Sequence, residues 1–282
     1  MLGDANPKCS PMNLRLALAA LLLAAPAASA AEAPPKADSR FVQPLPLDFN
    51  DHTGFVSIFD GTLEGWEGDR RFWRAENGVI IGENSAEHPS GNSYLTYKKL
   101  TAHDFDLRLE IKVENGGGSG VQYRSRLGVP WRSKTPPDVL AAVGPYNGAT
   151  MLTGPQADFW YPVNPKTFSY NGQAFAENSP LGIEAWLGQV VRQFGGDQSQ
   201  KKLVAMIAPP EQLTGHVKIN DWNQYEIIVR GGVFIHIING QLMAVLIDDD
   251  PTSTNQRPGL FGLEIENITK VSARNLYVRK LN

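Results

Sequence analysis

Two glutamates on one predicted strand carry the clearest chemical signal in this sequence. Glu264 and Glu266 are separated by a single residue, so on a strand their side chains point to the same face. Like charges this close destabilise a protein unless a cation or a shared proton compensates for them. The pair is therefore a candidate acid and base, a candidate cation site, or an exposed sheet edge without a function.

Three further segments with strand-like alternation carry polar side chains that could join this pair. The polar positions of interest are Glu110 in segment 105–113, Arg124 in segment 121–125, and Gln156 and Asp158 in segment 156–159. If these segments and the glutamate pair lie in the same sheet, their polar side chains share one concave face.

Such a face has the chemistry of a saccharide site. Carboxylates, amides and guanidinium groups hydrogen-bond sugar hydroxyls, and aromatic rings stack on the C–H faces of sugars. Trp160 and Tyr161 directly follow Phe159 in the sequence, so they are candidate stacking partners. Polar alternation is equally typical of the solvated face of an ordinary sandwich, and this second interpretation stays open.

Short strands separated by turns are predicted from about Phe55 to the end of the chain. Turns such as Asn77-Gly78 and Asn239-Gly240 are typical of hairpins, and no segment longer than two turns has a helical period. About a dozen short strands are too many for one open sheet. The pattern predicts an all-β jelly-roll sandwich of two antiparallel sheets, with long loops at 127–156 and 161–209 over the concave face.

Composition limits the class of partner. The chain has 282 residues, of which 42% are hydrophobic, and its formal net charge is −3. It can bury a sizeable core, but it lacks the broad basic field that binding to a phosphate backbone requires, so we expect no nucleic-acid partner. Residues 31–50 are predicted to form a linker rich in Ala and Pro, and residues 51–282 a single folded domain.

Residues 1–30 have the pattern of an N-terminal extension followed by a secretory signal peptide. We expect translation to start at Met12, where a short basic region begins. An apolar run at 16–25 and an Ala-Ser-Ala site that ends at Ala30 follow it. We expect cleavage after Ala30 and export to the periplasm or the extracellular space, although a membrane anchor or a disordered tail is the alternative. The mature chain would have no transmembrane segment, and it would lose Cys9, the only cysteine.

Several segments, taken in order, resemble one protein family. They are FVSIFDGTLEGW at 55–66, WRAENGVI at 73–80, GSGVQYR at 118–124, GPQAD at 154–158, DWNQYE at 221–226 and ARNLYVR at 273–279. Their combination is similar to the 3-keto-disaccharide hydrolase domain family, and the resemblance implies a concanavalin-like fold. One departure is clear, because Glu264-Ile265-Glu266 stands where the family usually has Gln-x-His.

The resemblance implies a hydrolase or lyase that cleaves 3-keto-glycosides. A ketone at C3 acidifies the C2 hydrogen, so a base can remove it, an electrophile can stabilise the enolate, and the aglycone can leave before water adds. Asp158 or Glu266 is the candidate base, and Arg124 is the candidate enolate stabiliser. The candidate substrate-binding residues are Glu110, Gln156, Glu264, Trp160 and Tyr161. A divalent cation could replace the arginine, and its candidate ligands are Glu110, Asp158, Glu264 and Glu266.

Three other functions remain open at this point. A glycoside hydrolase with two carboxylates would use Glu264 and Glu266, but residues at i and i+2 lie side by side rather than on opposite sides of a glycosidic bond. A non-catalytic, lectin-like saccharide-binding module becomes more plausible with the loss of the usual histidine. A structural or surface-assembly protein is the third alternative.

Overall fold

Strands make up almost all of the regular structure in the computed structural model, which describes residues 42–134, 147–161, 164, 170–195, 200–251 and 253–281. The predicted signal peptide and the first part of the predicted linker lie outside these ranges. The chain from Leu47 onward forms one compact unit. Within the described ranges, no helix is both long enough and apolar enough to cross a membrane.

The larger of the two sheets, sheet A, has ten strands. Its order is β12-β11-β15-β14-β13-β6-β17-β4-β3, and β1 pairs with β17. Its strands are β1 (Val56–Ser57), β3 (Trp73–Glu76), β4 (Val79–Glu83), β6 (Phe105–Glu114), β11 (Gln189–Phe194), β12 (Gln200–Met206), β13 (Asn223–Arg230), β14 (Val233–Ile238), β15 (Gln241–Asp248) and β17 (Lys270–Lys280). Only β11 and β15 pair in parallel among the described strands.

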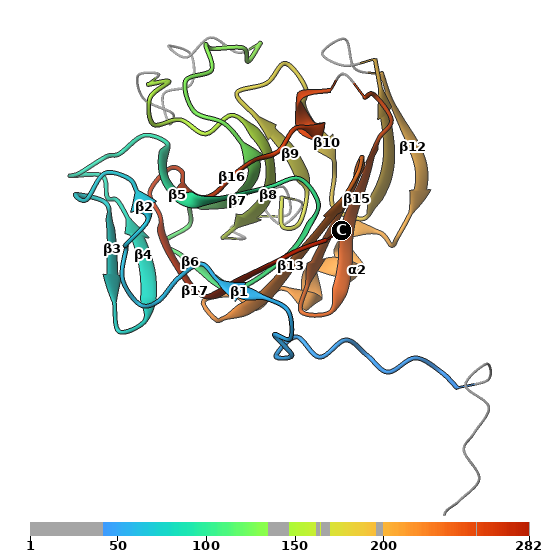
Figure 1. Cartoon of the computed structure of the whole chain (residues 1–282), viewed down its shortest axis with the longest axis horizontal. Coiled ribbons are helices and arrows are strands. Elements are labelled where there is room, and N and C mark those ends of the chain that lie inside the picture. Colours follow the sequence, from blue (N-terminus) through green and yellow to red (C-terminus); the bar gives the residue numbers. More distant parts are fainter. Residues whose placement is uncertain are drawn as a thin grey trace, which may run out of the picture. The chain divides into compact units, whose positions relative to one another are not determined.

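Sheet B has seven strands in the order β10-β9-β8-β7-β16-β5-β2. They are β2 (Trp66–Glu67), β5 (Ser93–Ala102), β7 (Gly118–Ser125), β8 (Gly154–Trp160), β9 (Ala174–Glu177), β10 (Gly182–Ala185) and β16 (Gly259–Ile265). The described helices are short, namely α2 (Pro210–Leu213), η3 (Thr214–His216) and η4 (Thr254–Gln256). Figure 1 shows β16, β7 and β8 in one layer and β6, β17 and β13 in the other, which confirms the predicted all-β sandwich of two antiparallel sheets.

Strand β6 shows how the sequence builds the core between the layers. Its apolar residues alternate along the strand, and all of them are buried: Phe105, Leu107, Leu109, Ile111 and Val113. The Phe105 ring lies 4.9 Å from that of Phe261 in β16 and 5.8 Å from that of Tyr123 in β7, so side chains of both sheets meet. Burial of each large apolar side chain contributes about 1.5–3 kcal/mol to the stability of the fold. The predicted core face of this strand is confirmed.

Two expectations about the arrangement of strands were wrong. Strand β6 does not lie in the sheet of β7, β8 and β16, because its neighbours are β13 and β17 of sheet A. The predicted loop 161–209 also contains four strands, β9 to β12. Of these, β9 and β10 extend sheet B, so they form part of its concave wall.

Candidate functional site

The registry of β7, β8 and β16 sets polar side chains in rows across the concave face of sheet B. Gly118 is paired with Trp160 on one side and with Glu266 on the other. Gly120 is paired with Asp158, and the pairing of Leu263 with Val121 places Glu264 on the far side of the same row. Two adjacent rows therefore carry one carboxylate from β16 each.

The two glycines of β7 make room for the side chains that lie over this strand. A Cβ atom at Gly118 would come within 2.5 Å of the Trp160 ring, and one at Gly120 within 2.3 Å of Cδ of Gln156. Both distances are far below van der Waals contact, so larger residues would displace the indole and the amide. The Gly-Ser-Gly segment is thus required by packing against the site.

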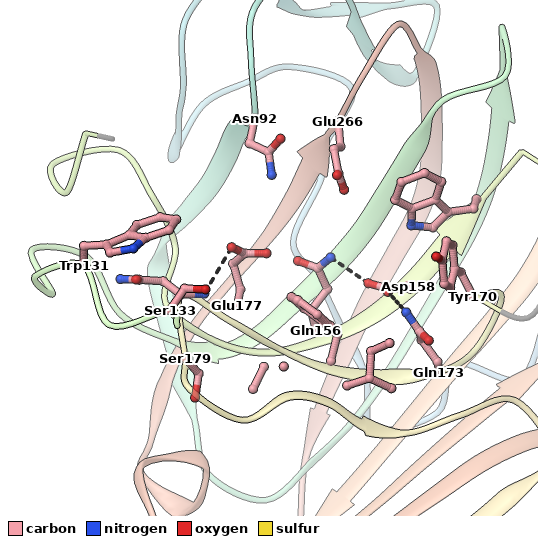
Figure 2. Close-up of a pocket in the computed structure, with 16 residues that line it drawn as sticks. Asn92, Trp131, Ser133, Gln156, Asp158, Tyr170, Gln173, Glu177, Ser179 and Glu266 are labelled. Atoms are coloured by element: carbon pink, nitrogen blue, oxygen red, sulfur yellow. Dashed lines mark hydrogen bonds between the residues drawn. The ribbon is translucent and has the colours of Figure 1, made fainter. Parts of the chain in front are cut away.

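A cavity of about 360 Å³ opens on this face, within the size range of small-ligand pockets. Figure 2 shows its lining, in which aromatic rings, amides and carboxyl groups face one space. Its aromatic residues are Trp131, Trp160, Tyr170 and Phe175; its amides are Asn92, Gln156, Gln173 and Asn178; and its acids are Asp158, Glu177 and Glu266. None of the described lining residues is Arg, Lys or His.

Hydrogen bonds hold the amides and carboxyl groups of the pocket floor in fixed orientations. Gln156 Nε2 donates to Asp158 Oδ1 at 2.7 Å and to Glu264 Oε2 at 2.8 Å. Its oxygen accepts a hydrogen bond from Gln122, which fixes the direction of the amide. Gln173 donates to the other oxygen of Asp158, and Asn92 donates to Glu264 Oε1 at 2.7 Å. Both carboxyl groups are therefore hydrogen-bonded at both oxygens.

Burial makes these acids weaker than usual. It raises the pKa of Asp158 from 3.8 to about 8, with a smaller contribution from the charge of Glu264, while the amide donors oppose the rise. Burial likewise raises the pKa of Glu264 to about 7. Burial and the charges of neighbouring acids, Glu264 foremost, raise the pKa of Glu177 and of Glu266 well above the usual range. The raised pKa values of these groups keep them protonated to a higher pH than usual, so the pocket holds groups that can donate protons and groups that can accept them.

Arg124 does not face this pocket, which corrects the expectation for that residue. Its backbone has φ +47°, and the register between β7 and β16 shifts next to it, so the regular alternation of side chains ends there. The guanidinium is fully buried and bonds to carbonyls of Gly231 and Asn255 at 2.9 and 3.1 Å and to the Asp104 carboxylate at 3.1 Å. Arg124 ties the end of β7 to neighbouring turns.

Glu110 and Tyr161 are not among the lining residues either. Glu110 lies on β6 in sheet A, where its carboxylate pairs with Arg274 at 2.9 Å and accepts from Asn275 at 2.5 Å. Tyr161 is partly buried against the core, with its hydroxyl 3.5 Å from Asn220. Gln156, Asp158, Trp160 and Glu266 do line the pocket, and Glu264 lies buried beside Gln156.

The expected set of cation ligands is incomplete without Glu110. Among the residues that the structure describes, no group of three or more His, Cys, Asp or Glu side chains is arranged to hold a metal ion. The carboxyl oxygens of Asp158 and Glu264 accept hydrogen bonds from side-chain amides.

Several lining residues were not expected from the sequence, above all Glu177, Gln173 and Asn92. Glu177 and Gln173 belong to a region that was expected to be loop, where the strand Ala174–Glu177 has only four residues. An alternation this short does not stand out from a loop. Asn92 directly precedes β5, and nothing about its position in the sequence indicates that it contacts Glu264.

Part of the chain is similar in sequence to a named bacterial protein. A protein of Bacteroides thetaiotaomicron named 3-keto-disaccharide hydrolase is 34% identical over 109 residues, which are 35% of this chain and 36% of that protein. The match thus spans about a third of this relative.

Two solved structures resemble the chain at lower identity. One is a Bacillus subtilis protein of unknown function with a galectin-like fold, with a TM-score of 0.49, 12% identity and coverage of 77% of this chain and 90% of that chain. The other is a Bacillus licheniformis β-glucanase, with a TM-score of 0.40, 11% identity and coverage of 81% and 97%. A model of one protein family matches the chain over residues 54–279, which is most of its length. The chain belongs to the family of 3-keto-alpha-glucoside-1,2-lyase-like domains.

Proposed function

We propose that this protein is an exported enzyme that cleaves 3-keto-glycosides by removal of the C2 proton and elimination of the aglycone. The observation that carries the proposal is that Asp158 and Glu266, both with raised pKa, face one pocket among aromatic rings and amides. The name of the Bacteroides thetaiotaomicron relative supports the same substrate class.

Asp158 is the base in this proposal. A ketone at C3 makes the C2 hydrogen acidic enough for a carboxylate to remove, and general bases work best when their pKa lies near the working pH. The pKa of about 8 gives Asp158 more basicity than an ordinary aspartate, while part of the population is still ionised at neutral pH. Gln156 and Gln173 hold its two oxygens in place.

Glu266 takes the role that was expected of Arg124. Negative charge develops on the C3 oxygen when the C2 proton leaves, and a hydrogen-bond donor at that point lowers the barrier. A carboxyl group kept protonated by burial can be such a donor. No hydrogen bond within the described part of the chain engages the Glu266 side chain, whose pKa is raised by burial and by Glu264 and Asp158.

The rings and amides are suited to bind the sugar itself. The Trp160 ring lies over Gly118 and lines the pocket, so it can stack on a sugar face, and the amides of Asn92 and Gln173 can exchange hydrogen bonds with hydroxyls. The same features fit a lectin-like module, which is the second candidate function. The two differ in whether bond cleavage follows binding.

The test measures aglycone release by the purified full chain from 4-nitrophenyl 3-keto-glucoside and from the unoxidised glucoside, each with and without chelator. Release from the keto form alone supports the proposal. Binding of saccharide without release favours the lectin, and hydrolysis of the unoxidised form favours a two-carboxylate glycosidase. Asp158→Asn should lower kcat by about 10²–10⁴-fold, whereas Asp249→Asn, an exposed acid paired with Arg192, should not.

Export is tested separately. The proposal expects the mature protein, recovered from the periplasm or the medium, to begin at Ala31. Peptide mapping identifies the N-terminus of the recovered protein. A recovered protein that still carries residues 12–30 would contradict the predicted cleavage.

A further inference from the structure

A third carboxyl group, that of Glu177, lies across the pocket from Asp158. Figure 2 shows Glu177 on the side of Trp131 and Asp158 on the side of Tyr170. Glu177 is paired with Gly154, four residues before Asp158 on β8, which corresponds to about 13 Å along the strand. Both side chains line the same pocket, so a ligand that fills it can contact both carboxyl groups.

Asn178 fixes both Glu177 and the segment that carries Trp131. The Asn178 backbone, at φ +48°, donates from N to Glu177 Oε1 at 3.1 Å. Its side chain donates to Pro130 O at 3.2 Å and accepts from the Arg132 backbone at 2.8 Å, on either side of Trp131. The carboxyl group and the indole therefore form one held end of the pocket.

Glu177 is 9% exposed and lines the cavity beside other acids. Burial, together with the charges of Glu264, Glu266 and Asp158, keeps the pKa of Glu177 well above the usual range. A glutamate in this environment keeps its proton to a higher pH than an exposed glutamate does, and it can give that proton to a basic atom of a ligand.

We propose that Glu177 is the general acid that protonates the departing aglycone oxygen, an inference that rests on the proposed function. The keto sugar lies at the Asp158 and Trp160 end, and the aglycone extends toward Trp131. Asp158 takes the C2 proton, the electrons form the C1–C2 double bond, and the C1–O bond breaks with its electron pair on the aglycone oxygen, which takes the Glu177 proton. Water then adds at C1, returning a proton to Glu177, while Asp158 returns its proton to C2.

This role predicts which substrates need Glu177. An aglycone that leaves as a stable anion, such as 4-nitrophenolate, departs without a proton, whereas a sugar hydroxyl or an alkyl alcohol does not. The acid would thus make the enzyme competent for keto-disaccharides, whose aglycone is a poor leaving group.

The experiment compares Glu177→Gln with the wild-type full chain on a 3-keto-disaccharide and on 4-nitrophenyl 3-keto-glucoside. We expect kcat/KM to fall by about 10²–10⁴-fold on the disaccharide and by less than about tenfold on the nitrophenyl substrate. The alkaline limb of the pH profile on the disaccharide should shift for the variant, because Glu266 is then the only one of the two acids that must still carry a proton. Glu76→Gln, on an exposed glutamate of β3 outside the pocket, is the matched control.

Equal losses on both substrates, or no loss on either, would overturn the assignment of Glu177. The thermal midpoint of Glu177→Gln, measured beside the wild type, identifies a folding defect, and Glu177→Asp then provides a second variant whose leaving-group selectivity is decisive. Failure of the wild type to cleave either keto substrate would instead refute the proposed function.

Discussion

The raised pKa of Asp158 makes the stability of the protein depend on pH in a defined direction. The pKa is about 8 in the folded protein and ordinarily 3.8, a difference of about 4, and each unit corresponds to about 1.4 kcal/mol. Ionisation of this one group therefore costs about 5–6 kcal/mol more in the folded than in the unfolded chain. Its contribution is present in full below about pH 4 and is lost as the pH rises to about 8.

Asp158→Asn removes this dependence. At about pH 5 the wild type bears an ionisation cost of about 1–2 kcal/mol, and the amide of the variant loses about as much through poorer hydrogen bonds with Gln156 and Gln173, so the two free energies of unfolding should be nearly equal. At about pH 9 the wild type bears the ionisation cost and the variant does not. Allowing about 1–3 kcal/mol for an imperfect hydrogen bond of the amide, the variant should be more stable there by about 2–5 kcal/mol.

Chemical denaturation followed by tryptophan fluorescence at several pH values, at constant ionic strength, measures this difference. The quantity of interest is the free energy of unfolding of Asp158→Asn minus that of the wild type, which should grow with pH. Asp249→Asn, on an exposed ion pair with Arg192, should give a small difference that varies little. A difference for Asp158→Asn that stays constant or falls with pH would refute the argument that burial governs this carboxyl group.

Three further predictions follow from the placement of residues around the pocket. Gly120→Ala puts a Cβ atom where Gln156 lies, so we expect a loss of about 1–3 kcal/mol in stability, measured by denaturation, and reduced cleavage of keto-glucosides. Glu110→Gln, on the opposite sheet, should leave kcat/KM within about twofold of the wild type, and a loss comparable to that of Asp158→Asn would contradict its placement. Arg124→Met should lower the unfolding free energy by about 3–5 kcal/mol because it removes the buried guanidinium that bonds to Asp104 and to the Gly231 carbonyl, and a stable but inactive variant would restore a role in catalysis.

The sequence predicted the parts of the fold that depend on local pattern. Alternation along β6 identified its buried face, because the period of two is a property of the strand itself. The sheet to which β6 belongs is decided by its pairing with β13 and β17. These partners are distant in the sequence, as the 165 residues between Glu110 and Asn275 show. Alternation carries no information about that choice, and so Glu110 was expected on the wrong surface.

The sequence predicted those residues of the candidate site that lie on or next to strands with regular alternation. Gln156, Asp158 and Glu266 sit on or next to uninterrupted strands, and they line the pocket as expected. The prediction for Arg124 was wrong because its positive φ reverses the direction of its side chain. A residue other than glycine gives no sign of such a φ in the sequence. Glu177 was missed because its strand is formed by pairing with β8 rather than by a pattern of its own.

In the proposed mechanism, Glu266 stands where the family resemblance implies a histidine, and this pocket makes a glutamate compatible with the same role. A glutamate in water would bring a negative charge to the place where the enolate forms, and that charge would oppose the reaction. Burial and the neighbouring Glu264 and Asp158 raise the pKa of Glu266, so its neutral form can donate a hydrogen bond as an imidazole N–H does. The acids of the pocket thus depend on one another, because each additional carboxyl group helps to keep the others protonated, and the first proton to leave makes the next one harder to remove.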